Sequence, residues 1–147
     1  MVFPDEGAEK RYGHLLAPEQ LVAFGHKVRD QETGWITHYE LSDDIRYTDI
    51  VIVIDDLCDG GATFNILSKS LNTKRKPDLY VTHGLFSKGI NELLDNYQTI
   101  MTTDSCFRGV NLKDASRQGF LWRQSYDASI KGRFIINDAK ALMERVK

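Results

Sequence analysis

The chain has 147 residues, which is close to the commonest length of one compact domain and long enough to bury a sizeable core. With 41% hydrophobic and 27% charged residues, and no apolar run of the roughly 18 residues that span a bilayer, we expect an ordinary globular protein. The composition argues against a membrane protein or a disordered one. The formal charge of −2 and the lack of a long basic run exclude a general attraction to nucleic acid, although they permit a specific anion site.

The two cysteines, Cys58 and Cys106, form no CxxC pair and have no histidine at ligand spacing. This argues against a disulfide scaffold and against a structural zinc site, and it favours reduced thiols. The first residues lack the basic and apolar regions of a secretion signal, so we expect a cytoplasmic protein.

The amino-terminal part of the sequence has weaker periodicity than the middle. Val2 and Phe3 resemble the end of a strand, and residues 19–28 can form another strand. Residues 30–38 are polar around a central glycine, which predicts a long surface loop.

The middle of the chain alternates between strand and helix patterns. Asp49–Ile54 is a nearly continuous β-branched run that suits a buried central strand, and a helical pattern begins at Thr63. Pro77–Thr82 and Thr99–Thr103 read as further strands, and between them apolar residues recur at helical spacing, namely Ile90, Leu93, Leu94 and Tyr97. This alternation predicts an α/β fold, a three-layer α/β/α domain with a mainly parallel sheet over residues 1–147.

The last forty residues carry two weaker signals. A terminal helix is predicted from apolar residues at helical intervals, Ile136, Ala139, Leu142, Met143 and Val146. Residues 107–109 and 120–122 contain aromatic side chains that can contact a base or a partner subunit, although core packing is the favoured reading.

The chemistry concentrates in residues 55–63, Asp-Asp-Leu-Cys-Asp-Gly-Gly-Ala-Thr, which follow the central strand where open α/β sheets bind ligands. Glycines let backbone amides approach an anion, the helix start adds a positive dipole, and the threonine adds a hydroxyl. Asp55 and Asp56 would repel phosphate, but they can accept hydrogen bonds from sugar hydroxyls or hold a hydrated cation. The loop therefore predicts a sugar phosphate more strongly than a plain glycine turn.

This loop resembles the phosphoribosyl-pyrophosphate (PRPP) motif of type I phosphoribosyltransferases and of ribose-phosphate pyrophosphokinases, the PRPP synthetases. Three other segments resemble the synthetases in order and spacing: residues 4–11, Pro-Asp-Glu-Gly-Ala-Glu-Lys-Arg; residues 26–29, His-Lys-Val-Arg; and residues 82–87, Thr-His-Gly-Leu-Phe-Ser. The resemblance extends from residue 2 to near residue 105. It implies a type I phosphoribosyltransferase-like fold and the carboxy-terminal lobe of a longer, two-lobed protein.

The resemblance also implies roles for the matching residues. The 5-phosphate would be held by Asp59, Gly60, Gly61, Ala62 and Thr63, and the ribose hydroxyls by Asp55 and Asp56. Asp5 would help to bind Mg²⁺. Lys27 and Arg29 would lie on a mobile catalytic loop and neutralise the pyrophosphoryl group that passes from ATP to ribose 5-phosphate in nucleotide biosynthesis. The full-length protein would be a homo-oligomer.

Other readings of these residues stay open. Lys27 and Arg29 can be the solvated face of a strand, Asp5 can shape a Pro-Asp turn, and His83 is more readily a loop-orienting hydrogen-bond partner than a base. The sequence lacks the synthetase's amino-terminal lobe, which carries much of the ATP site. A phosphoribosyltransferase that uses PRPP, or a non-catalytic regulatory relative of the synthetases, therefore remains an alternative.

Overall fold

The computed structural model describes residues 1–106 and 132–138 of the chain. Its centre is a seven-stranded sheet in the order β3-β2-β1-β4-β5-β6-β7. The strands are β1 (Val2–Phe3), β2 (Ala23–Arg29), β3 (Ile36–Leu41), β4 (Ile52–Cys58), β5 (Asp78–Gly84), β6 (Ile100–Thr103) and β7 (Phe134–Asn137). All neighbouring strands run parallel except β3, which is antiparallel to β2. The mainly parallel α/β sheet predicted from the sequence is thus confirmed.

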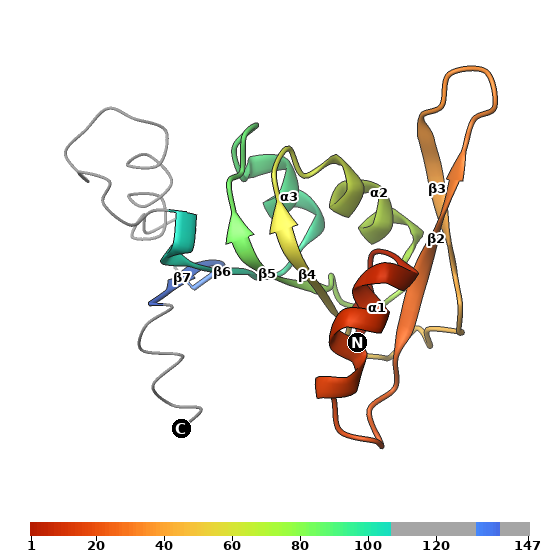
Figure 1. Ribbon diagram of the computed structural model, residues 1–147, viewed down its shortest axis with the longest axis horizontal. Coiled ribbons are helices and arrows are strands. Elements are labelled where there is room, and N and C mark those ends of the chain that lie inside the picture. The colour runs from red at the N-terminus through yellow and green to blue at the C-terminus, as the bar shows by residue number, and fades with distance from the viewer. Residues whose placement is uncertain (107–131, 139–147) are drawn as a thin grey trace.

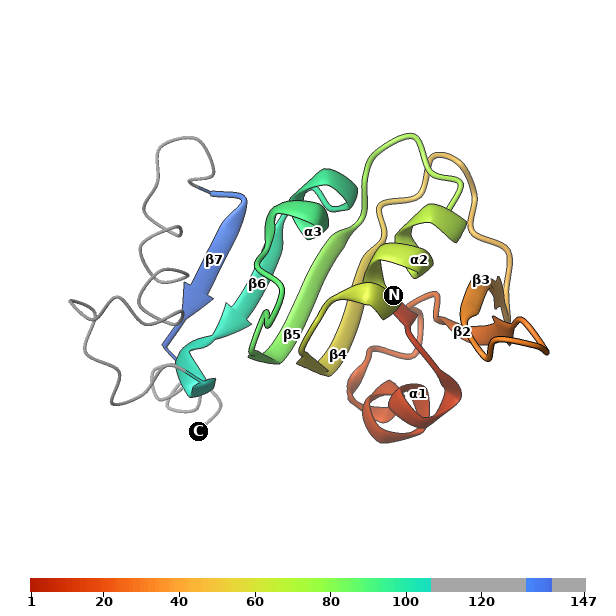
Figure 2. The ribbon, with the colours of Figure 1, turned by 90° about the horizontal axis from the view of Figure 1, so that it is seen from above.

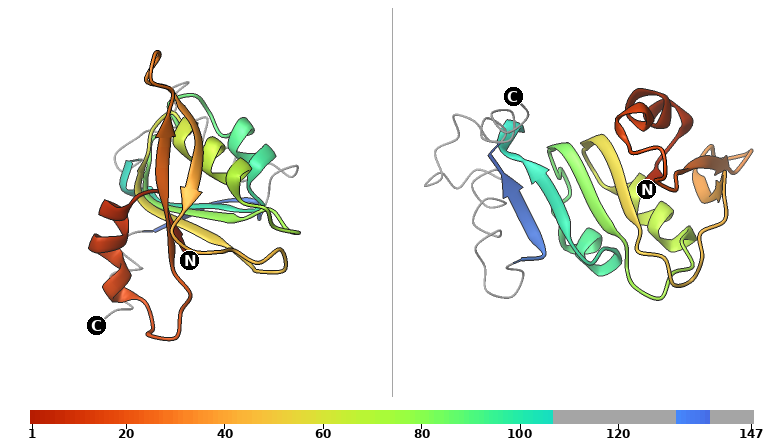
Figure 3. Two further views of the ribbon diagram at one scale, coloured as in Figure 1. Left: turned by 90° about the vertical axis from the view of Figure 1, so that its right-hand side faces the viewer. Right: turned by 90° about the horizontal axis from the view of Figure 1, so that it is seen from below.

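Helices cover both faces of this sheet. Helix α1 (Glu6–Tyr12) lies on one face, while α2 (Ala62–Ser70) and α3 (Asn91–Asn96) lie on the other (Figures 1 and 3). Two short 3₁₀ turns, η1 (Gly13–Leu15) and η2 (Asp104–Cys106), follow α1 and β6. No helix within residues 1–106 and 132–138 combines the length and apolar character needed to cross a bilayer.

The core forms where the β-branched strands meet the apolar face of α2. Val53, Leu79 and Val81 on the central strands are fully buried, and Leu67 of α2 is fully buried against them. The helical spacing of Phe64, Leu67 and Leu71 places their side chains on one face of α2, which explains this packing. Burial of side chains of this size stabilises the fold by about 1.5–3 kcal/mol each.

The sheet reverses its winding direction at β1. From β1 the chain passes through α1 to the parallel neighbour β2 on one side, whereas β4 lies on the other side of β1. The carboxyl ends of β1 and β4 are therefore followed by loops that diverge to opposite faces. Such a switch point is where open α/β sheets bind ligands.

The predicted surface loop at residues 30–38 is wrong in its second half. Residues 30–35 form a tight turn, closed by hydrogen bonds from the Glu32 and Thr33 amides to Asp30 Oδ1, and β3 begins at Ile36. Strands β2 and β3 thus form a hairpin that projects from the sheet (Figure 1). The error arose because the polar turn residues obscured the strand pattern that follows them.

Three further boundaries differ from the prediction. The central strand continues through Asp55 and Asp56 to Cys58, because β4 pairs with β5 along this whole stretch. Lys27 and Arg29 lie in strand β2 and not on a loop. Ile136 lies in strand β7, so the predicted terminal helix does not include it. The remainder of that helix and the aromatic segments at 107–109 and 120–122 fall outside the described residues.

Candidate functional site

The candidate site lies at the carboxyl edge of the parallel strands. Figure 2 shows the arrowheads of β4 and β5 at one edge, with α2 starting directly after β4. A cavity of about 310 Å³ opens there, lined by Lys27, Asp55, Leu57, Asp59, Gly60, Gly61, Ala62, Thr63 and Phe64. Strand β2 contributes Lys27, and β4 with the start of α2 contributes the rest. Most of the residues predicted to bind a sugar phosphate therefore share one cavity.

The amino end of α2 has the features of an anion site. Gly61 is the N-cap residue, and its φ of 79° lies in the left-handed region that glycine adopts without strain. No side chain caps the helix, so the first amides of α2 remain available. Free amides and the helix dipole together favour a bound anion at this position.

The segment after β5 forms hydrogen bonds with the backbone that leads into residues 59–63, here called the phosphate loop. The amides of Leu85 and Phe86 donate to the carbonyl of Cys58 at 2.9 and 3.2 Å, and the amide of Ser87 donates to the carbonyl of Asp59 at 2.8 Å. Phe86 adopts φ 47°, an unusual conformation for a non-glycine residue that directs the chain back toward Asp59. The segment after β5 thus fixes the position of residues 58 and 59.

Lys88 and Ser87 lie beside Gly60. A Cβ atom added at Gly60 would stand 3.6 Å from Lys88 Cδ and Cε and 3.7 Å from Ser87 Oγ. These two side chains therefore border the glycine loop at Gly60, which has no side chain of its own. Neither side chain was predicted as a site residue, although Ser87 ends the segment 82–87 that resembles the synthetases.

Asp55 and Asp56 occupy different surroundings because successive strand residues point in alternating directions. Asp55 lines the cavity below α2, whereas Asp56 reaches toward α1, where its Oδ2 lies 3.8 Å from Arg11 Nη1. Burial raises the pKa of Asp55 to about 6; the hydrogen bond from the Asp56 amide opposes this shift, and the carboxylates of Asp56 and Asp5 add to it. A ligand that brings hydroxyl donors to Asp55 would stabilise its charged form.

Asp5 and Lys27 form an ion pair at the rim of the cavity. Lys27 Nζ lies 3.0 Å from Asp5 Oδ2, and Asp5 Oδ1 accepts a hydrogen bond from the Ala8 amide as the N-cap of α1. Asp5 therefore has a structural role as a helix cap, in line with the alternative that the sequence left open beside magnesium binding. Within residues 1–106 and 132–138 no group of three or more His, Cys, Asp or Glu side chains is arranged to hold a metal ion.

Arg29 is directed elsewhere. Its guanidinium donates to the carbonyl of Gly34 at 3.0 Å across the hairpin turn. A second cavity of about 230 Å³ lies between this hairpin and α2, lined by Arg29, Thr33, Gly34, Trp35, Ile36, Ala62, Thr63 and Ile66. The two cavities meet at Ala62 and Thr63, and Lys27 and Arg29 line one cavity each.

Tyr39 lies beside the candidate site, opposite a residue that lines it, and was not predicted from the sequence. It lies on β3 opposite Lys27, is only 4% exposed, and its hydroxyl makes no hydrogen bond within the described part of the chain. The β-branched and aromatic residues from Ile36 to Leu41 were the signal that could have revealed this strand. His83, in contrast, bonds to Ser105 Oγ at 2.7 Å, in agreement with its expected orienting role.

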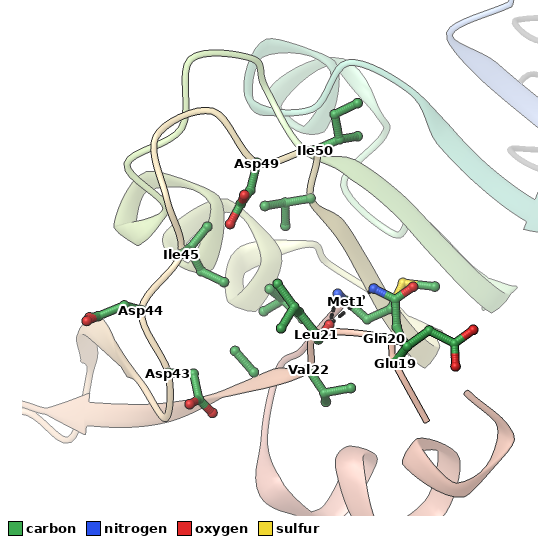
Figure 4. Close-up of a pocket in the computed structure, with 13 residues that line it drawn as sticks. Met1, Glu19, Gln20, Leu21, Val22, Asp43, Asp44, Ile45, Asp49 and Ile50 are labelled. Atoms are coloured by element: carbon green, nitrogen blue, oxygen red, sulfur yellow. Dashed lines mark hydrogen bonds between the residues drawn. The ribbon is translucent and has the colours of Figure 1, made fainter. Parts of the chain in front are cut away.

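Another cavity lies at the opposite end of the strands and does not suit a phosphate. It measures about 480 Å³ and is bordered by Met1, Leu21, Ile50 and the carboxylates of Asp43, Asp44 and Asp49 (Figure 4). The Met1 ammonium at its wall is bound to the Leu21 carbonyl at 2.7 Å. Clustered carboxylates repel phosphate, so the smaller cavity at α2 is the better anion site.

Comparisons with known proteins support the fold. The crystal structure of phosphoribosylpyrophosphate synthetase from Mycobacterium smegmatis is similar to this one, with a TM-score of 0.60 and 19% sequence identity. The similarity covers 99% of this chain and 42% of the synthetase chain, so this chain spans less than half of that protein. No protein-family model and no curated protein sequence matches the chain. Together with the parallel sheet, the structural similarity shows that the chain has an α/β fold shared with part of a PRPP synthetase.

Proposed function

We propose that this chain binds ribose 5-phosphate or PRPP at the amino end of α2, and that it contributes this site to a two-lobed ribose-phosphate pyrophosphokinase. The observation that carries the proposal is the shared cavity at the switch point, where an uncapped helix start stands beside Asp55 and Lys27. The free amides of the helix start can bind a phosphate, and the Asp55 carboxylate can accept hydrogen bonds from ribose hydroxyls.

The phosphate would lie on the backbone amides that begin α2. Gly61, Ala62 and Thr63 present amides that lack intrahelical acceptors, and Thr63 adds its hydroxyl. The carbonyl of Asp59 accepts a hydrogen bond from the Ser87 amide, which fixes the backbone at the start of the loop. Lys88 brings positive charge next to Gly60 and would attract the phosphate over short range.

The sugar would stand above the end of β4. Asp55 would accept hydrogen bonds from a ribose hydroxyl, and Asp56 would accept from a second one after partial release of Arg11, which is 3.8 Å away. These contacts would hold the 1-hydroxyl away from the phosphate loop and toward the open side of the cavity.

Pyrophosphoryl transfer would then occur from ATP to that hydroxyl. The 1-oxygen of ribose 5-phosphate forms a bond to the β-phosphorus of ATP, the bond from this phosphorus to the α-phosphate oxygen breaks, AMP leaves, and the hydroxyl proton is released. Lys27 and Arg29 would neutralise the charge of the pyrophosphoryl group during its transfer. Arg29 would first have to leave its contact with the Gly34 carbonyl.

Magnesium fits the donors present. Carboxylate oxygens are the ligands that Mg²⁺ prefers, and it commonly uses one or two of them together with substrate phosphates. Asp5 would hold the ion through Oδ2 once Lys27 has moved toward the phosphates. When bound, the ion would offset the negative charge of the two anionic substrates.

Two other functions are kept as candidates. The second cavity, with the 77% exposed Trp35 next to Thr63, offers a planar surface beside the phosphate and favours a phosphoribosyltransferase that binds a base there. Release of pyrophosphate from PRPP that depends on an added base would identify this activity. Binding without turnover, even in a longer parent protein, would instead indicate a regulatory relative of the synthetases.

The test is calorimetric titration of the chain with ribose 5-phosphate and with PRPP, each with and without Mg²⁺. The test variant is Asp55→Asn with Asp56→Asn. The control is Asp43→Asn with Asp44→Asn, which removes the same charge from two adjacent exposed residues at the far end of the sheet.

We expect saturable binding by the unsubstituted chain and by the control, and a strong loss of binding in the test variant without loss of folding. Equal loss of binding in both variants would show that the lower net negative charge, and not the position of Asp55 and Asp56, causes the loss, and it would contradict the proposed site. If no chain binds either ligand, the proposed sugar-phosphate site is wrong.

A further inference from the structure

Tyr39 is held in a fixed position by its neighbours. Its amide donates to Ser70 Oγ of α2 at 3.1 Å, and one edge of its ring lies against Gly25 of β2. A Cβ atom at Gly25 would stand 2.3 Å from Tyr39 Cδ1, so the ring occupies space that any other residue at position 25 would fill. Helix α2 packs against β3, the strand that carries Tyr39.

The buried end of this ring carries a hydroxyl without a partner. Tyr39 is 4% exposed, and Oη makes no hydrogen bond within residues 1–106 and 132–138. Buried hydroxyls are nearly always paired in folded proteins, because an unpaired one loses its hydrogen bonds to water without replacement. An unpaired buried hydroxyl therefore indicates a partner other than the described residues, such as a bound ligand.

Tyr39 on β3 pairs directly with Lys27 on β2, so the two side chains lie on the same face of the hairpin, and Lys27 lines the cavity at the start of α2. The pKa of Tyr39 is raised to about 12, first by burial; Thr63 and Arg29 lower it, and Asp5 and Asp55 raise it further. Thr63, Arg29 and Asp55 line the two cavities at α2, and Asp5 pairs with Lys27 at the rim. The Thr63 side chain is near enough to Oη to lower this pKa as a hydrogen-bonding neighbour does, but the two groups do not have the distance and angle of a hydrogen bond. The hydroxyl is thus a proton donor, at neutral pH, beside the second residue of α2.

We propose that the Tyr39 hydroxyl donates a hydrogen bond to the phosphate group held at the amino end of α2, as a further ligand-binding residue of this site. The inference rests on the proposed sugar-phosphate function. A phosphate monoester has three terminal oxygens, more acceptor positions than the amides of Gly61, Ala62 and Thr63 fill, and a neutral hydroxyl adds a donor on the side of the hairpin. This hydrogen bond would also link the position of β3 to the binding of phosphate at the start of α2.

The test is Tyr39→Phe, which removes only the hydroxyl. The control is Tyr47→Phe, the same change at a residue that is 57% exposed. Each chain is titrated with ribose 5-phosphate and with inorganic phosphate, and its melting temperature is measured without ligand.

We expect the Tyr39 variant to melt at the same or a higher temperature without ligand, because its hydroxyl has no partner to lose. Its affinity for both ligands should fall by about tenfold or more, the usual effect of losing a hydrogen bond to a charged group. The control should behave as the unsubstituted chain does.

Several outcomes would overturn the inference. Unchanged affinity for both ligands would mean that the hydroxyl contacts only water, and loss of affinity for the sugar phosphate alone would place it on the sugar. A lower melting temperature without ligand would reveal a structural partner. If the unsubstituted chain binds neither ligand, the proposed function fails first, and the inference falls with it.

Discussion

Lys27 Nζ lies 3.0 Å from Asp5 Oδ2, so the cation expected to act on the transferring group is held by the carboxylate expected to bind magnesium. The same carboxylate caps α1 through the Ala8 amide. Asp5 therefore joins β1, α1 and β2 at the switch point of the sheet. Because Mg²⁺ and the Lys27 ammonium would compete for one oxygen, loading of the site and release of Lys27 should be linked.

The two roles of Asp5 can be separated by substitution. Asp5→Ala removes both the cap and the ion pair, and we expect it to cost about 1 kcal/mol for the cap and less than about 1 kcal/mol for the partly exposed pair. Asp5→Asn keeps a capping oxygen and should cost only the ion pair. Urea unfolding of the two variants measures this difference. Equal destabilisation would show that the cap contributes nothing.

Lys27 and Arg29 can be tested in a longer parent protein that contains the missing lobe. Lys27→Ala with Arg29→Ala should leave ribose 5-phosphate binding little changed, because neither residue belongs to the phosphate loop. Turnover should fall by about a thousandfold or more, as when other cationic groups that stabilise phosphoryl transfer are removed. The matched control is Lys74→Ala with Lys76→Ala, two exposed lysines at the same spacing. A large loss of ribose 5-phosphate affinity would contradict the assignment.

Asp55 predicts an unusual dependence of stability on pH. Its pKa in the folded chain is about 6, above its ordinary value of 3.8, so the folded state binds the proton more tightly than the unfolded state does. The contribution of this raised pKa to the free energy of unfolding is fully present below about pH 4, and it is lost as the pH rises through about 6. Asp55→Asn should therefore raise the melting temperature at pH 8 more than at pH 4. Asp44→Asn, at an exposed position, should not; an identical response of the two variants would show that Asp55 is not buried as described.

Gly60 and Gly61 should respond differently to alanine. Gly60→Ala meets nothing closer than 3.6 Å and should change the free energy of unfolding by less than about 0.5 kcal/mol. Gly61→Ala forces a side chain into φ 79° and within 3.2 Å of Leu93, so we expect a cost of about 1–3 kcal/mol. Thermal or urea unfolding compares them directly. Similar costs would mean that the phosphate loop adjusts freely, against the bracing by Ser87 and Phe86.

The central elements could be predicted because their local patterns are strong. The β-branched run before Asp55 and the helical spacing after Thr63 each reflect burial against the same core, and β4 and α2 form close to where they were expected. The boundary at Asp55 was wrong because pairing with β5 continues past the apolar residues. Charged residues in a strand are stabilised here by backbone pairing, which local composition does not reveal.

The β2–β3 hairpin shows where local pattern fails. The polar turn from Asp30 to Trp35 is stabilised by hydrogen bonds to Asp30, and this local chemistry was read as a loop that continued to residue 38. Tyr39 is buried only because α2, which follows it by more than twenty residues, packs against β3. Such a contact cannot be read from the residues adjacent to Tyr39.

The sequence alone determined the alternation of strands and helices and the chemistry of residues 55–63, because periodicity and a glycine-rich helix start are local properties. The tertiary structure decided which distant groups join that loop. Lys27 of β2 lines the cavity of that loop, Tyr39 of β3 lies opposite Lys27, and Ser87 after β5 binds the Asp59 carbonyl. Only the strand order of the sheet brings these three segments together. It also decided which oxygens are already engaged, since the Asp5 carboxylate is bound by Lys27 and Ala8 whereas the Tyr39 hydroxyl is bound by none of the described residues. The physical reason is that strand order and burial depend on contacts between residues far apart in the chain.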